Sequence, residues 1–345
     1  MKYKIEKNTV QETLIIPLYA RKACSELYPN LYRDETAIRL IDEIDYDFSE
    51  AEKNSHSLMQ RFGALEVAMR QNDLAWEVRD YLKTHPNAAV VNLGCGLDST
   101  GRSCDNGSCK IYNLDFPDVI TVRNELLPAG EREENIPCNL NDTAWFSEID
   151  ASNGAAFFAS GVFYYFLTEQ VKALVQTMAD AFPGGVLVFD AANRTAVKMI
   201  AKTWLKSAKI KDVGAYFAVS DAKSELSLWD SRLQVTSRGY MLGYNDLRDP
   251  SVSGFFRFLA KVGDGMMKMQ IVKIGFGGGK WRKAENVRRP CNEIHRYAHG
   301  DVDAVCAVLP KPADSGVRLR YEYGKSHHEK SKAEIQGDHL RAARI

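Results

Sequence analysis

Two glycines and two acidic residues have the types and the spacing of a ligand site. Gly94 and Gly96 follow a short apolar run, Asp98 comes two residues later, and Asp115 ends the next apolar run. Glycine lets the backbone turn sharply and approach a ligand closely. A carboxylate accepts hydrogen bonds from both hydroxyls of a ribose. The pattern predicts a nucleoside site where two neighbouring strands end.

The residues around the glycines bear on which nucleoside this site would take. The dinucleotide pattern G-x-G-x-x-G needs a third glycine at position 99, which is Ser99. The negative charge of Asp98 opposes a pyrophosphate and suits the sulfonium or amino group of S-adenosylmethionine. The segment therefore favours S-adenosylmethionine. An NAD(P)-dependent oxidoreductase and a glycine turn that binds nothing stay open as alternatives.

Alternating strands and helices are predicted to position these residues. Helices are expected at 119–127, at 168–182 with Thr168 as its N-cap, and at 193–208. Strands separated by helices imply an α/β fold, with a parallel sheet covered on both faces. The expected strands are 88–93, 110–114, 136–140, 155–160, 186–189, a possible sixth at 214–219 and a last at 269–276.

The regions flanking this core differ from it in pattern. Residues 10–85 look helical, because their apolar residues recur on one helix face. From Gly277 the chain has 14 Lys or Arg against 9 Asp or Glu and little periodicity. The predicted domains are a helical N-terminal cap at 1–86, a cofactor-binding core at 87–276 with a substrate lid around 220–266, and a disordered or weakly folded tail at 277–345.

The overall composition narrows the class of protein. Lys plus Arg and Asp plus Glu number 45 each, which gives no general attraction to nucleic acid. No apolar run approaches the roughly 18–20 residues of a membrane span, and the first residues lack an apolar signal region. We expect a cytoplasmic protein without nucleic-acid or membrane partners. The seven scattered cysteines suggest reduced thiols, and Cys104 and Cys109 lack partner ligands for a metal.

Five segments, in order, resemble the leucine carboxyl methyltransferase family, most closely its bacterial branch of polyketide O-methyltransferases. The resemblance implies a Rossmann-like class I methyltransferase, with a seven-stranded, mostly parallel sheet whose last strand is antiparallel. It also implies S-adenosylmethionine as methyl donor and a carboxylate or phenolic oxygen of a small, polyketide-like molecule as acceptor. The segments are 12–21, 68–70, 90–99, 113–120 and 139–145.

The resemblance also implies roles for individual residues. Gly94 and Gly96 would line the methionine part of the cofactor, and Asp115 would bind its ribose. Arg70, helped by Arg21, would bind the methionine carboxylate. The complete predicted cofactor set is Arg21, Arg70, Gly94, Cys95, Gly96, Asp98, Asp115, Phe116, the adenine-bordering Asn139, Leu140 and Asn141, and Ser160 with Gly161.

The acceptor side is predicted less fully. Tyr165, Arg238 and Tyr244 are candidate acceptor-pocket residues, and no residue is assigned a catalytic role with certainty. Before position 277 the only histidines are His56 and His85, neither at a predicted strand end. We therefore expect catalysis by positioning, without an essential histidine or a metal. A non-catalytic binding protein of the same fold remains the other alternative.

Overall fold

The computed structural model describes residues 2–5, 10–54, 57–200 and 216–277. All of these described residues belong to one compact unit. The second half of the helix predicted at 193–208 and the predicted tail beyond Gly277 lie outside the described residues.

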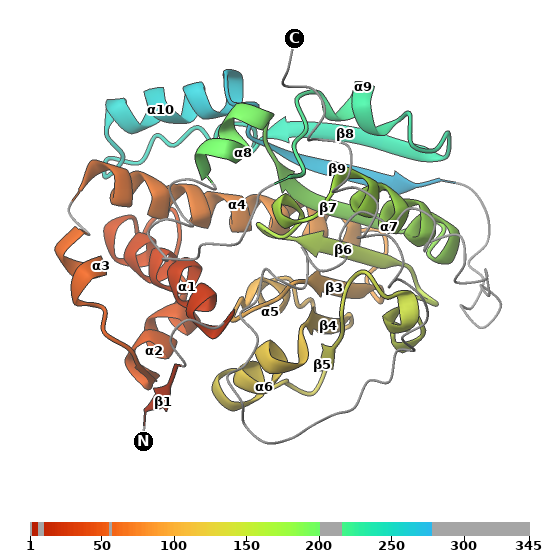
Figure 1. Cartoon of the computed structure of the whole chain (residues 1–345), viewed down its shortest axis with the longest axis horizontal. Coiled ribbons are helices and arrows are strands. Elements are labelled where there is room, and N and C mark those ends of the chain that lie inside the picture. The colour runs from red at the N-terminus through yellow and green to blue at the C-terminus, as the bar shows by residue number, and fades with distance from the viewer. Residues whose placement is uncertain (1, 6–9, 55–56, 201–215, 278–345) are drawn as a thin grey trace, which may run out of the picture. The chain divides into compact units, whose positions relative to one another are not determined.

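A seven-stranded sheet forms the centre of this unit, in the order β5-β4-β3-β6-β7-β9-β8 (Figure 1). β9 is antiparallel to both of its neighbours, β7 and β8, and the remaining pairs are parallel. This confirms the predicted fold. The strand order reverses at the β3–β6 pair, which makes that point of the sheet a place where ligands bind in open α/β folds. The strands are β3 Ala89–Leu93, β4 Lys110–Asp115, β5 Glu133–Pro137, β6 Ala155–Ala159, β7 Val186–Ala191, β8 Leu233–Gly239 and β9 Gln270–Phe276.

Helices precede the sheet and connect its strands. α4 lies against β6, β7 and β9, and α1 packs on α4, α2 and α6. Asp34 caps α2 and Ser57 caps α4, each through a side-chain oxygen that accepts a backbone N–H. The helices are α1 Val10–Leu27, α2 Glu35–Glu43, α3 Ser49–Asn54, α4 Leu58–Leu82, α5 Thr100–Ser103, α6 Pro117–Leu126, α7 Thr168–Ala181, α8 Arg194–Ile200, α9 Ala222–Leu226 and α10 Gly254–Gly265, with short strands β1 Tyr3–Lys4 and β2 Ile44–Asp45 and 3₁₀ turns η1 Thr143–Glu148 and η2 Phe163–Tyr165.

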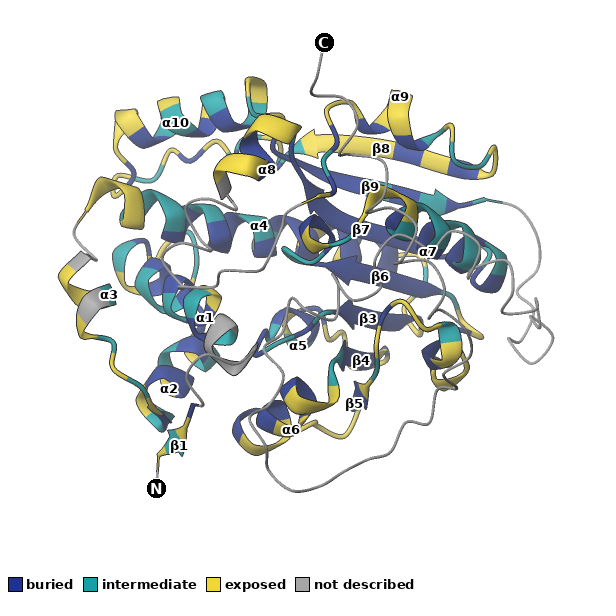
Figure 2. Cartoon of the chain, viewed as in Figure 1, coloured by how far each residue is buried: buried dark blue, intermediate teal, exposed yellow. Residues whose placement is uncertain are grey.

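The central strands are buried on both faces (Figure 2). Successive side chains of a strand point to opposite faces. Val91 and Phe157 accordingly join the core with α7, whereas Val90 and Phe158 join the core with α4. Burial on both faces explains why these strands are mostly apolar runs in the sequence.

Three predicted details are wrong. The sixth strand is not at 214–219, because the described residues 216–219 are not strand, and Leu233–Gly239 takes its place. This edge strand buries only Leu233 and Val235, so its apolar signal is short. The third strand lies at Glu133–Pro137 rather than 136–140, and it buries only one residue. Thr168 is the first residue of α7, and Leu167 precedes it as the cap, with its N–H donating to Gln170.

Candidate cofactor-binding site

The turn after β3 requires glycine at both predicted positions. Gly94 has φ +67° and Gly96 has φ +47°, in the left-handed region that side chains disfavour. A Cβ at Gly94 would also lie 2.6 Å from Val162 Cγ2, in the loop after β6. The two loops at the β3–β6 reversal are thus packed against each other.

Asp115, at the end of β4, lies directly beside this turn. Its carboxylate accepts hydrogen bonds from the Gly96 and Phe116 N–H groups, each at 2.8 Å. Burial raises the pKa of Asp115 to about 6, and the two N–H donors act in the opposite direction. The structure therefore brings together the predicted ribose ligand and the predicted glycine turn.

Two buried arginines hold the carbonyl groups of the turn. Arg123 Nη1 donates to the carbonyl oxygens of Gly96 and Asp98, both at 2.8 Å, and Arg21 Nη2 donates to that of Leu97, also at 2.8 Å. Arg21 is 2% exposed and Arg123 1%. Sequence reasoning missed Arg123, which lies within an expected helix with no local signal of its contacts. Fixing the carbonyls keeps the turn in one conformation.

Asp98 is surrounded by donors from the chain itself. Its oxygens accept from Arg21 Nη1 at 3.1 Å, Gln71 Nε2 at 3.1 Å and Asn92 Nδ2 at 3.3 Å, as well as from both the N–H and the hydroxyl of Thr100. Arg21 also pairs with Asp34. These bonds make Asp98 and Arg21 an internal support of the turn. Direct contact of either residue with the cofactor stays a prediction.

A second cluster lies where β6 and β7 end. Asp190 accepts from the Gly161 N–H at 2.6 Å and from Arg70 Nη1 at 3.2 Å. A Cβ at Gly161 would lie 3.1 Å from Arg70 Nη1, so the guanidinium rests on the glycine backbone. Burial opposes the charge on Arg70, but Asp190 favours it and the pKa of Arg70 is raised. The predicted residues Arg70 and Gly161 therefore lie against each other, and both bond to Asp190. The sequence did not assign this role to Asp190.

Two further observations fit a ligand at this edge. Ser160 Oγ and Arg70 Nε are both buried, and neither atom has a hydrogen-bond partner among the described residues. On the other side of the turn, Asp115 pairs in register with Pro137, so Asn139, Leu140 and Asn141 follow directly beside it. Leu140 is buried and the two asparagines are more exposed, with Asn139 accepting from Asn141. The predicted adenine-bordering residues therefore neighbour the predicted ribose ligand.

The predicted cysteine of the turn is buried and unpaired. Cys95 is 1% exposed, and its N–H donates to the Leu114 carbonyl at 2.9 Å. Burial raises the pKa of its thiol, so the thiol stays protonated near neutral pH. Cys24, Cys104, Cys109 and Cys138 are also free thiols. In the described part of the chain, no group of three His, Cys, Asp or Glu residues is placed to hold a metal.

The three candidate acceptor-pocket residues lie in two places. Tyr165 is near Arg70 and Asp190, whose charges act on its pKa. Arg238 instead lies over the Trp76 ring at 4.9 Å and the Tyr244 ring at 5.3 Å. The Tyr244 hydroxyl donates to Glu77, farther along α4. The structure therefore groups Arg238 and Tyr244 with Trp76, and leaves Tyr165 at the end of β6.

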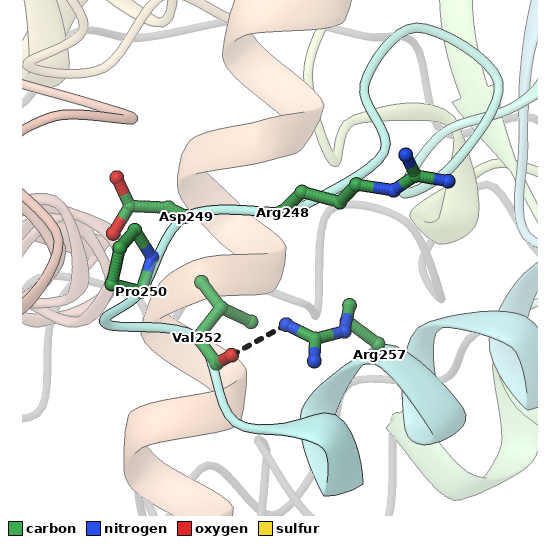
Figure 3. A pocket seen from close by; sticks show the side chains of 5 residues that line it. All are labelled: Arg248, Asp249, Pro250, Val252 and Arg257. Atoms are coloured by element: carbon green, nitrogen blue, oxygen red, sulfur yellow. Dashed lines mark hydrogen bonds between the residues drawn. The ribbon is translucent and has the colours of Figure 1, made fainter.

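A pocket in the predicted lid segment is lined by Arg248, Asp249, Pro250, Val252 and Arg257 (Figure 3). Arg257 Nη1 donates to the Val252 carbonyl at 2.7 Å. All of its lining residues come from the loop before α10 and the first turns of that helix. The pocket therefore belongs to the predicted lid and shares no residue with the glycine turn. The predicted lid range 220–266 also contains β8, an edge strand of the sheet.

His85 lies away from this edge. Its ring stacks on Tyr81 at 4.3 Å, after the end of α4, and Tyr81 donates to the Gly184 carbonyl. His56 lies outside the described residues. No helix among the residues with assigned structure is long and apolar enough to cross a membrane.

The chain is similar in sequence to a known family and to two curated methyltransferases. Residues 17–179 match the family model of the leucine carboxyl methyltransferases. The tetracenomycin polyketide synthesis O-methyltransferase TcmP of Streptomyces glaucescens is 28% identical over 183 residues, 53% of this chain and 66% of that protein. The S-adenosyl-L-methionine-dependent methyltransferase dpfgK of Gibberella zeae is 24% identical over 258 residues, 70% of this chain and 85% of that protein. A solved DUF574 family protein from Streptomyces avermitilis aligns with 74% of this chain and 96% of its own, at 12% identity and a TM-score of 0.48.

The family match and the two curated relatives, together with the strand order and the antiparallel β9, place the chain in the class of S-adenosylmethionine-dependent methyltransferases. The predicted enzyme class and cofactor are thereby confirmed. Within this class, residues 17–179 are similar to the leucine carboxyl methyltransferase family.

Proposed function

We propose that this protein transfers the methyl group of S-adenosylmethionine to an oxygen of a small, polyketide-like molecule, either a phenol or a carboxylate. The observation that carries the proposal is the Asp115 carboxylate, bonded to the Gly96 N–H at the carboxyl edge of the sheet. The printed function of the Streptomyces relative, polyketide O-methylation, supports an oxygen acceptor. The match spans about two thirds of that relative. The methyl acceptor of the relative is therefore not assigned to this chain.

The residues of the site have separate tasks in this proposal. Asp115 binds the ribose, and Arg70, fixed by Asp190, provides the positive charge for the methionine carboxylate. Ser160, with its free hydroxyl, is available to the methionine amino group. The cofactor supplies a methyl group already activated by its sulfonium. The protein therefore works mainly by holding the acceptor oxygen in line with that methyl group and by excluding water.

The competing oxidoreductase function would need a pyrophosphate beside the turn. At that place Ser99 replaces the third glycine of the dinucleotide pattern. This difference favours the methyltransferase.

Two measurements test the proposal together. Calorimetry of the full chain with S-adenosylmethionine, S-adenosylhomocysteine and NAD(P) should show binding of the first two only. Mass spectrometry of incubations with a panel of aromatic acids and phenols, including multi-ring polyketide-like compounds, should show a gain of one methyl group on oxygen. Binding of NAD(P) alone would overturn the proposal. Cofactor binding with no methylated product from any panel member would instead support a non-catalytic binding protein.

A further inference from the structure

Glu66 and Tyr240 are far apart in the sequence and joined in the structure. The Tyr240 hydroxyl donates to Glu66 Oε1 at 2.6 Å. Tyr240 is 2% exposed, whereas Glu66 is half-buried. Glu66 Oε2 makes no hydrogen bond or ion pair with any residue that the structure describes. The Glu66 carboxylate is thus held through Oε1, and Oε2 is free to accept a hydrogen bond or a proton.

The direction of α4 places Glu66 over the carboxyl edge of the sheet. Near the C-terminal end of α4, Tyr81 lies beside Gly154, just before β6 begins. Nearer its N-terminal end, Arg70 lies on Gly161, just after β6 has ended. Glu66 is four residues before Arg70, which is about 6 Å farther along the helix on the same face. Glu66 therefore lies beyond Arg70, outward from the strand ends.

The surroundings of Glu66 favour a carboxylate that takes up a proton readily. Burial raises the pKa of Glu66, the Tyr240 hydrogen bond and the Arg70 charge lower it, and the Asp190 charge raises it. Burial also raises the pKa of Tyr240, with Glu66 adding to the rise, so Tyr240 remains protonated and keeps donating. The net pKa of Glu66 is higher than that of an ordinary glutamate, which makes it a stronger base.

We propose that Glu66 accepts the proton of a hydroxyl-bearing methyl acceptor, and that Tyr240 is the positioning residue that aims it. The inference rests on the proposed oxygen methylation. As the O–CH₃ bond forms, the S–CH₃ bond breaks and its electron pair stays on sulfur. The proton of the acceptor hydroxyl passes to Glu66 Oε2. A phenol is mostly protonated at neutral pH, since its pKa is about 10, and so needs such a base.

The test compares variants on acceptors of different acidity. Glu66→Gln and Tyr240→Phe are assayed with a phenol from the panel and with its para-nitro counterpart, which is already ionised near neutral pH. Glu77→Gln is the matched carboxylate control, because both Glu77 oxygens are occupied, by Tyr244 and Lys273. Tyr81→Phe is the hydroxyl control for Tyr240→Phe, because the Tyr81 hydroxyl donates instead to the Gly184 carbonyl. Calorimetry with S-adenosylhomocysteine checks each variant for a folded cofactor site.

We expect Glu66→Gln to lower kcat for the phenol on the order of 10²-fold or more, the usual effect of losing a general base. The nitrophenol rate and the S-adenosylhomocysteine affinity should change little, and Tyr240→Phe should show a smaller loss of the same kind. Equal losses for both acceptors, no loss at all, or lost cofactor binding would each overturn the role of Glu66. Wild-type methylation of carboxylates alone would overturn it while leaving the proposed function standing. Absence of any wild-type methylation would overturn the proposed function itself.

Discussion

Arg123 Nη1 donates a hydrogen bond to the Gly96 carbonyl oxygen at 2.8 Å, and Arg123 is almost fully buried. The same nitrogen bonds the Asp98 carbonyl, so a helix that follows β4 holds both ends of the turn that follows β3. The amide of Gly96 is used as well, by Asp115. The turn is therefore fixed from both sides before any ligand binds, and its integrity depends on a residue that need not touch the cofactor.

We expect Arg123→Met to destabilise the protein by about 2–4 kcal/mol, because two buried carbonyls lose their partner. It should also weaken S-adenosylhomocysteine binding, since the turn loses its support. Urea unfolding and calorimetry measure the two effects. Arg33→Met is the control, because the Arg33–Glu35 pair is exposed and worth less than about 1 kcal/mol. Equal stability of the two variants would contradict a supporting role for Arg123.

Cofactor binding should depend on pH through Asp115. Its pKa is raised to about 6, and an ionised carboxylate is the better acceptor for ribose hydroxyls. Binding should therefore be constant above about pH 7 and weaken as the pH falls through 6, approaching tenfold per pH unit where protonation dominates. Calorimetry with S-adenosylhomocysteine between pH 5 and 8 would measure this. Asp115→Asn should bind more weakly at pH 8 and lose most of the pH dependence, and an unchanged slope in that variant would show that another group titrates.

Gly161→Ala should disturb the cluster that holds Arg70. The added Cβ would lie 3.1 Å from Arg70 Nη1, and the φ of +71° strains any side chain. We expect S-adenosylhomocysteine affinity to fall roughly tenfold, about 1.4 kcal/mol, because Arg70 must move. The matched control is Gly184→Ala, which has φ +82° and no neighbour within 4 Å of its Cβ. It carries a similar backbone strain of about 1–2 kcal/mol. Equal affinity in the two variants would rule out the Arg70 contact as the cause.

The sequence predicted the centre of the fold better than its edges. Strands β3, β6 and β7 are buried on both faces, so each is a mostly apolar run that can be recognised locally. Strands β5 and β8 lie at the two edges of the sheet. Each of these strands buries only one or two residues. For this reason the position of β5 was predicted a few residues too late, and β8 was not predicted. A half-covered edge strand carries too few apolar positions to be distinguished from a loop.

The residues of the candidate site also differ in how well the sequence predicted them. Gly94, Gly96 and Asp115 could be predicted because they lie within a few residues of strand ends, where local pattern and function coincide. Arg123 and Asp190 could not be assigned their contacts, since their partners are 27 and 29 positions away. Glu66 and Tyr240 are 174 positions apart, and their pairing depends on how α4 lies across the sheet. Such pairings are set by tertiary packing, which leaves no local pattern.

A buried carboxyl in α4 should make the stability of the fold depend on pH. Asp73 is 2% exposed, and its Oδ2 has no partner among the described residues. Burial raises the pKa of Asp73 to about 9, and the charges of Asp264 and Glu77 act in the same direction. In the unfolded chain its pKa is about 3.9. Because the folded state binds this proton more tightly, the contribution of Asp73 is most favourable below about pH 4 and declines as the pH rises toward 9.

Asp73→Asn removes this titration while keeping the shape of the side chain. At pH 7 the wild-type protein must take up a proton on folding, at a cost of up to about 4 kcal/mol. We therefore expect the variant to be more stable by about 2–4 kcal/mol at pH 7, with the difference shrinking toward pH 4. Urea unfolding between pH 4 and 9 would measure both slopes. Asp80→Asn, at a more exposed site paired with Lys83, should change stability by less than about 0.5 kcal/mol. A destabilised Asp73→Asn at pH 7 would show instead that Asp73 is ionised and bound to a partner in the folded protein.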